Sequence, residues 1–126
     1  MIISKNISQF LAVFAGGGMG ALLRYSISNL IKQNTLNFPL ATFFVNASGC
    51  FLIGLLFNLI KTDSSILRLL LIVGFLGGFT TFSTFANETY QLIIAGKYST
   101  AFFYVFLSNI ICFISVYAGA KFTSIF

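Results

Sequence analysis

The sequence predicts an all-α integral membrane protein with four transmembrane helices, and three observations lead to this fold class. Of the 126 residues, 58% are hydrophobic and only 7% are charged, and the mean hydropathy is +0.99. A soluble domain of this size leaves much of its surface in water and could not bury so many apolar side chains. Four uncharged runs also recur, over residues 6–23, 33–60, 69–87 and 98–120.

The first two helices are expected over residues 7–31 and 39–60. A helix needs about 20 residues to cross a hydrocarbon core of about 30 Å, and the uncharged runs are close to this length. The N-terminal apolar run is interpreted as a retained helix rather than a signal peptide, because Arg24 and Tyr25 follow it directly and no small-x-small cleavage site is evident. Pro39 suits the first turn of the second helix.

The third and fourth helices are expected over residues 66–95 and 99–121. Asp63 or Ser64 is a candidate cap for the third helix, which should be broken near residues 77–80, where hydroxyl side chains follow a glycine pair. Small residues also recur at four-residue spacing, which lets helices approach closely. These are Gly16 and Gly20, Gly74 and Gly78, and Ser115 and Gly119. The whole chain, 1–126, is expected to form one transmembrane domain.

Composition also limits the classes of function. The chain has no histidine and no acidic cluster, which nearly excludes a metallo-hydrolase, and it carries no nucleotide-binding motif. Its net charge of +5 is spread singly over helix ends, so it indicates topology and headgroup contact rather than nucleic-acid binding. Cys50 and Cys112 both fall inside predicted helices, where they are interpreted as packing residues, with a disulfide or metal pair as the alternative.

The basic residues predict only a weak orientation bias. One side of the membrane would collect Lys5, Lys61, Arg68 and Lys121, and the other would collect Lys32 and Lys97, with Arg24 if it extends that way. Two outcomes follow from this near balance. The chain either inserts in one orientation set by the small excess, or inserts both ways and pairs antiparallel with itself.

Residues 74–90 carry the clearest signs of function. Irregular backbone and hydroxyls occur at membrane depth only where they face protein or line a wet path. Phe82 and Phe85 lie three residues apart and share a helix face beside Ser83 and Thr84. This combination predicts the wall of a narrow conduit.

Three polar residues within the predicted helices each have two interpretations. Asn46 is either a pore-lining donor or a tie between helices. Arg24 either extends to the interface or draws anions into a vestibule. Glu88 either pairs with a lysine or arginine or carries a proton or cation. Amide and hydroxyl donors together with the positive edges of phenyl rings suit an anion better than a cation.

Three motifs resemble the small fluoride channels, the Fluc family: Gly-Gly-x-Gly-Ala-x-x-Arg-Tyr at 17–25, Phe-x-Val-Asn-x-x-Gly-x-Phe-x-x-Gly at 43–54, and Gly-x-x-Gly-Gly-x-Thr-Thr-Phe-Ser-Thr-Phe at 74–85. The resemblance implies an antiparallel, dual-topology homodimer with two fluoride pores and a structural sodium ion at the dimer centre. It also implies passive export of fluoride from a microbial cell, through the plasma membrane if the cell is bacterial. Outside acid would deliver the ion as membrane-permeant HF, which dissociates in the cytoplasm.

The resemblance also implies roles for individual residues. Asn46 would line the pore, and the ring edges of Phe82 and Phe85 would meet fluoride. Gly77 and Thr80 would lend backbone carbonyls to the sodium ion, and Arg24 would lie near the vestibule. A polar track would be completed by Thr81, Ser83, Thr84, Glu88, Tyr104 and Ser108.

Two other functions remain open from the residues. A small multidrug-type exporter driven by protons would use Glu88 as its obligatory carrier, although this residue lies near a helix end. A non-transporting subunit of a larger complex would show no transport alone. In every case the lipid bilayer is the expected environment, and neither nucleic acid nor a nucleotide is an expected partner.

Overall fold

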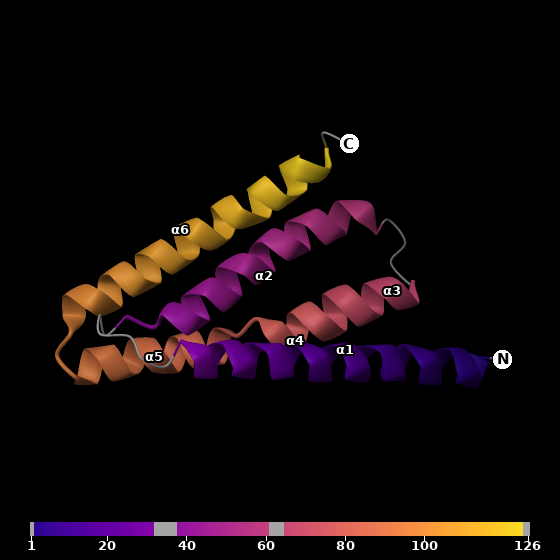
Figure 1. Cartoon of the computed structure of the whole chain (residues 1–126), viewed down its shortest axis with the longest axis horizontal. Coiled ribbons are helices and arrows are strands. Elements are labelled where there is room, and N and C mark those ends of the chain that lie inside the picture. Colours follow the sequence, from indigo (N-terminus) through magenta and orange to yellow (C-terminus); the bar gives the residue numbers. More distant parts are fainter. Residues whose placement is uncertain (1, 32–37, 61–64, 125–126) are drawn as a thin grey trace.

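The computed structural model describes residues 2–31, 38–60 and 65–124, with residues 2–5 described by their backbone only. Every regular element in these ranges is helical (Figure 1). The elements are α1 (Ile2–Leu30), α2 (Leu40–Leu59), α3 (Ile66–Arg68), the π-helical η1 (Leu69–Leu76), α4 (Gly77–Phe79), α5 (Phe82–Ile94) and α6 (Tyr98–Thr123). Four spans are long and apolar enough to cross a membrane, Asn6–Leu30, Leu40–Leu59, Ile66–Ile94 and Tyr98–Thr123. The predicted all-α fold with four membrane-spanning helices is confirmed.

The helix ends differ from the expected ones in detail. The first helix begins at Ile2 rather than at residue 7, and the fourth extends to Thr123 rather than to residue 121. The expected caps Asp63 and Ser64 lie outside the described residues. The cap of α3 is instead Ser65, whose hydroxyl accepts a hydrogen bond from the Arg68 N–H at 3.1 Å.

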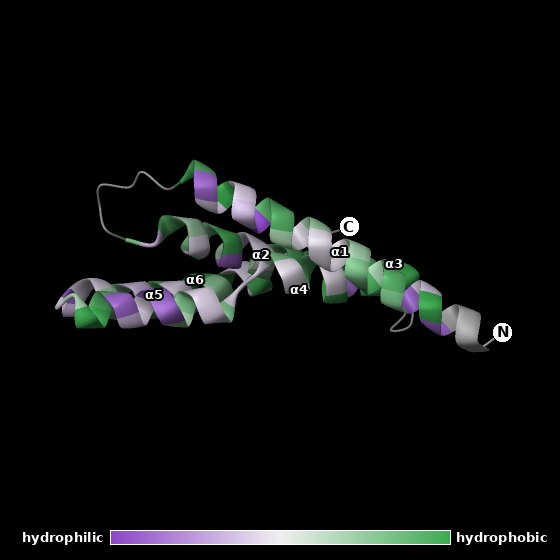
Figure 2. Cartoon of the chain, turned by 90° about the horizontal axis from the view of Figure 1, so that it is seen from below, coloured by the Kyte–Doolittle hydropathy of each residue, from purple (hydrophilic) through white to green (hydrophobic). Residues whose placement is uncertain are grey.

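The spans bury little of their own apolar surface. Within the most apolar window of each span, only 17% to 22% of the residues are buried inside the chain. Phe14 and Leu30 are 81% and 84% exposed. Figure 2 shows hydrophobic or neutral residues along most of the helices, with polar residues interspersed along α5. Such surfaces require lipid or another protein chain as their neighbour.

The helices form two parallel pairs. In Figure 1, α1 lies alongside η1 and α4, and α2 lies alongside α6, while the two termini lie at the same end of the molecule. Where α1 meets the third span, Gly16 lies against Gly74, and Gly20 lies against the backbone of Phe75. A Cβ atom at Gly20 would overlap the Phe75 carbonyl oxygen. The predicted close approach of helices at these small residues is therefore confirmed.

The second pair, α2 and α6, keeps one register along its whole length. Two contacts one helical turn apart show it: a Cβ atom at Gly54 would overlap the Val116 carbonyl oxygen, and the Asn58 Nδ2 donates to the Ala120 carbonyl at 3.1 Å, with the partners 62 residues apart in both. We call this row of pairs the α2–α6 seam. Its rungs are pairs at this spacing: Gly54 with Val116 and Asn58 with Ala120, which touch, Cys50 with Cys112 and Asn46 with Ser108, which line one cavity, and Thr42 with Tyr104, which both donate to Glu88.

The third span changes its backbone conformation twice. Leu69–Leu76 is π-helical, and helical geometry continues through Gly77 and Gly78 to Phe79. Thr80 (φ −78°, ψ 157°) and Thr81 (φ −151°, ψ 117°) are then extended, before α5 starts at Phe82. The extended residues are thus Thr80, the last residue of the stretch 77–80 in which the sequence placed an interruption, and Thr81, which follows it.

Two small clusters of buried side chains flank these threonines. Val45, Leu76 and Phe79 pack where α2 meets the third span, and Leu92, Ala101 and Tyr104 pack where α5 meets α6. The threonines therefore lie between two packed regions that hold the neighbouring helices in place.

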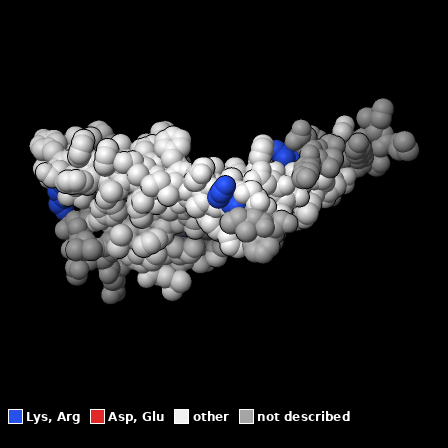
Figure 3. All heavy atoms as spheres, turned by 90° about the horizontal axis from the view of Figure 1, so that it is seen from above, with Lys and Arg blue, Asp and Glu red and all other residues white. Residues whose placement is uncertain are grey.

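The described basic side chains form no patch. Arg68 and Lys121 belong to the end that carries the termini, and Lys97 belongs to the opposite end. Figure 3 shows Lys and Arg side chains singly, at separate places on the face that it presents. The side chains of Lys5, Lys32 and Lys61, on which the predicted orientation bias also depends, lie outside the described part of the chain.

Candidate functional site

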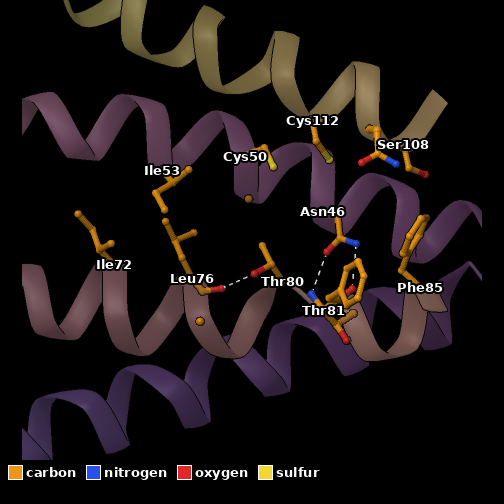
Figure 4. A pocket seen from close by; sticks show the side chains of 14 residues that line it. Asn46, Cys50, Ile53, Ile72, Leu76, Thr80, Thr81, Phe85, Ser108 and Cys112 are labelled. Atoms are coloured by element: carbon orange, nitrogen blue, oxygen red, sulfur yellow. Dashed lines mark hydrogen bonds between the residues drawn. The ribbon is translucent and has the colours of Figure 1, made fainter. Parts of the chain in front are cut away.

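A cavity of about 360 Å³ opens between α2, α6 and the third span, and we call it the central cavity (Figure 4). One wall is apolar and includes Ile53, Ile72 and Leu76, and the rest carries amide, hydroxyl, thiol and phenyl groups. The central cavity is lined by seven of the predicted site residues, Asn46, Gly77, Thr80, Thr81, Phe82, Phe85 and Ser108.

The Asn46 side chain is bound to the extended backbone. Its Oδ1 accepts a hydrogen bond from the Thr81 N–H at 2.8 Å, and its Nδ2 donates to the Thr81 carbonyl oxygen at 3.0 Å (Figure 4). This reciprocal pair satisfies both backbone groups of a residue that is outside any helix. An amide has two N–H donors, and the second one on Asn46 has no partner among the described residues. Asn46 thus ties α2 to the third span and still offers a donor at the cavity.

Asn46 also frees a carbonyl. In a continuous helix the Thr81 N–H would bond to the Gly77 carbonyl four residues earlier, but here it donates to Asn46. The Thr80 carbonyl loses its helical partner in the same way. The Thr84 N–H, four residues later, donates to the Thr81 Oγ1 at 3.2 Å instead. Within the described residues, the carbonyls of Gly77 and Thr80 therefore lack their helical partners.

Three predicted hydroxyls form one cluster at the start of α5. Thr81 caps this helix, and its Oγ1 donates to the Thr84 Oγ1 at 3.0 Å and lies 3.3 Å from the Ser83 Oγ. The cap explains why Thr81 is extended while the chain resumes a helix immediately afterwards. The cluster satisfies its own members, and its hydroxyls can still rotate toward a ligand.

The two candidate phenyl rings lie side by side. The centroids of Phe82 and Phe85 are 5.7 Å apart and their planes are tilted by 41°. Phe85 also packs against Tyr104, with centroids 5.0 Å apart, whereas Phe82 is 79% exposed in the single chain. Phe85 is therefore held by its own chain, and Phe82 has a face left for another neighbour.

Ser108 provides an unsatisfied polar group. The residue is only 6% exposed, it lines the central cavity, and its Oγ has no hydrogen-bond partner in the part of the chain that the structure describes. A buried hydroxyl without a partner costs about 1–3 kcal/mol, so the Ser108 hydroxyl is available to bind a ligand at the cavity.

Glu88 lines a second cavity, toward the end of the molecule opposite the termini, together with Thr84 and Lys97. Its Oε1 accepts a hydrogen bond from the Thr42 hydroxyl at 2.9 Å, and its Oε2 accepts one from the Tyr104 hydroxyl at 2.7 Å. Both of these donors are hydroxyls, and the interpretation in which Glu88 pairs with a lysine or arginine stays a prediction. Two neutral hydroxyls hold the carboxylate, and because Thr84 also belongs to the hydroxyl cluster, it connects the two cavities.

Arg24 lies on neither of these two cavities. Its Nε donates a hydrogen bond to the Gly78 carbonyl at 3.1 Å, which ties α1 to the third span just before the extended threonines. Its place near a vestibule stays a prediction.

Thr42 is the site residue that the sequence did not reveal. It is 4% exposed and is one of the two donors to Glu88. Its position one helical turn before Asn46 was the available signal, because residues four apart share a helix face.

Known proteins resemble this chain over most of its length. The family model for CrcB-like protein, Camphor Resistance (CrcB), matches residues 11–120. A protein of Hydrogenobaculum sp. (strain Y04AAS1), named fluoride-specific ion channel FluC, is 49% identical over 115 residues, which cover 88% of this chain and 93% of the relative. Proteins with the same name from Phocaeicola vulgatus and Ruminiclostridium cellulolyticum are 43% identical over 117 residues and 44% identical over 119 residues. They cover 90% and 91% of this chain, and 96% and 92% of the relatives.

Proposed function

The chain belongs to the CrcB-like protein family, and from this premise we propose that it is a fluoride-specific ion channel. It is a multi-pass protein of the bacterial cell membrane and not an enzyme. The single observation that carries the assignment is the 49% identity over almost the whole chain to a protein of that name. Its role is passive export of fluoride, which gives the cell resistance to the ion.

The central cavity supports the passage of an anion. The free N–H of Asn46 and the unpartnered hydroxyl of Ser108 are both hydrogen-bond donors. Phe82 and Phe85 offer ring edges that carry partial positive charge. Among the described residues no lysine or arginine lines this cavity, so no full charge from them would hold the ion too tightly to leave.

We assign the exit route to the hydroxyls between the two cavities. An ion that leaves the central cavity near Phe85 meets Thr81, then Ser83 and Thr84. Thr84 also lines the second cavity together with Glu88, and Tyr104, which donates to Glu88 from the buried side, completes the polar track. Each hydroxyl can turn its hydrogen toward a passing anion and then back to its neighbour.

We propose that the working unit is an antiparallel homodimer with two pores, and that copies of the chain insert into the membrane in both orientations. Phe82, a candidate pore residue, is 79% exposed in one chain, so one chain alone encloses the ion incompletely. A second copy would cover this face and suits the near balance of basic residues between the two sides.

A structural sodium ion fits the freed carbonyls. Unwound backbone carbonyls are the ligands that membrane proteins use for sodium, and the carbonyls of Gly77 and Thr80 have lost their helical partners. Two oxygens leave most of the coordination shell of a hard cation unfilled, and a second copy of the chain would double them. The ion would neutralise the carbonyl dipoles where two copies meet.

A proton-coupled exporter finds no support. Such a protein needs a carboxylate that gains and loses a proton during each cycle, and Glu88 accepts hydrogen bonds from two hydroxyls toward one end of the molecule. The deciding experiment is fluoride efflux from liposomes that contain only the purified chain and a potassium ionophore. We expect fluoride to leave without a nucleotide or a proton gradient while chloride is retained. Absence of efflux from folded protein would indicate a non-transporting subunit instead.

A further inference from the structure

Cys50 and Cys112 face each other across the α2–α6 seam. One turn further along the same seam, a Cβ atom at Gly54 would overlap the Val116 carbonyl oxygen, so the two backbones touch there. Because the register is constant, the close approach at Gly54 also brings the cysteines together one turn earlier. Both side chains line the central cavity, where Figure 4 shows them next to each other.

Both cysteines are free thiols and half-buried. Around them the central cavity presents apolar side chains such as Ile53 and Leu76, and, within the part of the chain that the structure describes, no acidic, basic or histidine side chain. The buried hydroxyl of Ser108, one turn before Cys112, has no partner among the described residues. The surroundings therefore offer two soft sulfur ligands beside an apolar wall, with one unsatisfied hydroxyl nearby.

We propose that Cys50 and Cys112 form a paired thiol site that binds one soft, two-coordinate metal cation, of which Hg²⁺ is the clearest case. Thiolates select soft cations, and two ligands suffice for linear coordination. On binding, each S–H bond breaks, two S–Hg bonds form, and two protons pass to the solvent. The two thiolates cancel the charge of the cation, so the bridged group is neutral and suits an apolar wall, which disfavours a charged group.

The chain offers a clean test, because it has two cysteines and both belong to the proposed site. Purified protein is titrated with Hg²⁺, free thiols are counted, and the bound metal is counted by intact-protein mass spectrometry. We expect one Hg²⁺ per chain, with both thiols protected, and resistance to removal by a monothiol such as 2-mercaptoethanol. The matched variants Cys50→Ser and Cys112→Ser should bind Hg²⁺ through one sulfur and lose it to the same monothiol.

Three results would overturn the proposal. Two Hg²⁺ ions per chain would show that the thiols react separately, and equal resistance in a single-serine variant would show that no bridge forms. A covalent dimer on a denaturing gel that contains no reductant would show that the metal joins two copies. None of these measurements depends on fluoride transport, so they decide the thiol site even if the proposed function fails.

A flux measurement tests where the metal lies. If Hg²⁺ occupies the central cavity, loading it should lower fluoride efflux through the wild-type chain. Efflux through Cys50→Ser/Cys112→Ser should be the same with and without Hg²⁺. Undiminished efflux through wild-type protein that carries one Hg²⁺ per chain would overturn the placement of the ion in the cavity.

Discussion

Asn46 and Thr81, 35 residues apart, pair through two hydrogen bonds, with the Thr81 N–H donating at 2.8 Å and the Asn46 Nδ2 donating at 3.0 Å. The side chain thus takes the place that a neighbouring turn of helix would have for this peptide group. The two interpretations of Asn46 from the sequence, a tie between helices and a pore donor, are compatible in this geometry. One N–H of the amide makes the tie, and the other is left at the cavity.

Asn46→Asp should abolish most fluoride efflux. Aspartate keeps the acceptor for the Thr81 N–H but loses the donor to its carbonyl, at a cost of about 1–3 kcal/mol in stability. An ionised carboxylate would also repel fluoride by several kcal/mol at low dielectric, and each ~1.4 kcal/mol of barrier slows passage about tenfold. Initial efflux from liposomes is the measurement, with size-exclusion chromatography to confirm folding.

Asn58→Asp is the matched control for that change. Asn58 lies on the same helix and also donates to a carbonyl, that of Ala120, at 3.1 Å, but it does not line the central cavity. Its efflux should stay near that of the wild-type chain. If both aspartate variants lose efflux equally, the effect of Asn46→Asp comes from lost packing rather than from the ion path.

Phe82→Ile and Phe85→Ile should each reduce efflux strongly. Isoleucine keeps the hydrophobic character and removes the positive ring edge. Phe82 is 79% exposed, so its replacement should barely change the stability of a single chain, whereas Phe85→Ile should lose about 0.5–1.5 kcal/mol of ring contact with Tyr104. Phe14→Ile, at an 81% exposed position on α1, is the control. Wild-type efflux in both Phe82→Ile and Phe85→Ile would remove the rings from the pore.

Gly20→Ala should destabilise the fold, and Gly18→Ala should not. A Cβ at Gly20 overlaps the Phe75 carbonyl, whereas one at Gly18 meets nothing within 4 Å. Forcing a methyl group into packed backbone typically costs about 1–3 kcal/mol, while alanine in an open helix position is better than glycine by about 0.5–1 kcal/mol. Thermal unfolding of the two variants in the same detergent measures the difference. Equal melting temperatures would contradict the observed packing of α1 on the third span.

Glu88→Gln separates a channel from a proton-coupled exporter. Glutamine still accepts one hydrogen bond, and the hydroxyls of Thr42 and Tyr104 can rotate to accept from its amide. We therefore expect reduced but measurable fluoride efflux, and no response to an imposed proton gradient in either protein. Complete loss of transport, together with wild-type flux that follows the proton gradient, would favour the exporter.

Both insertion orientations should occur in one membrane. The expectation comes from the near balance of basic residues at the two ends of the molecule. Epitope tags at the N-terminus and, separately, at the C-terminus should each be only partly digested when protease is added outside sealed vesicles. Digestion that is all or nothing would rule out the dual-topology homodimer.

The fold was largely predictable because the composition of the sequence is enough to specify it. Four uncharged runs of sufficient length dictate four helices in lipid, since each backbone group must be satisfied within its own segment. The glycine spacing also predicted close approach of helices, and the structure shows which helices meet, with Gly20 against the third span. The π-helical Leu69–Leu76 was not predictable, because no residue type specifies that geometry.

The positions of the site residues were easier to predict from the sequence than their hydrogen-bond partners. Asn46, Phe82 and Phe85 line one cavity, and it was the resemblance to the fluoride channels that brought these three residues together from the sequence. The partners of Glu88 were not foreseen, because two hydroxyls from other helices, Thr42 and Tyr104, satisfy it. Such contacts depend on the register between helices, which a single sequence does not specify.

The constant register of the α2–α6 seam makes the lengths of these helices matter as much as their composition. Inserting or deleting one residue rotates everything beyond it by about 100° around the helix axis. A deletion near Gly49 would therefore separate Cys50 from Cys112 and Asn58 from Ala120 in one step, however conservative the remaining sequence. Changes of chain length should be tolerated in the connections between spans, and inside α2 or α6 each one should disrupt the rungs beyond it.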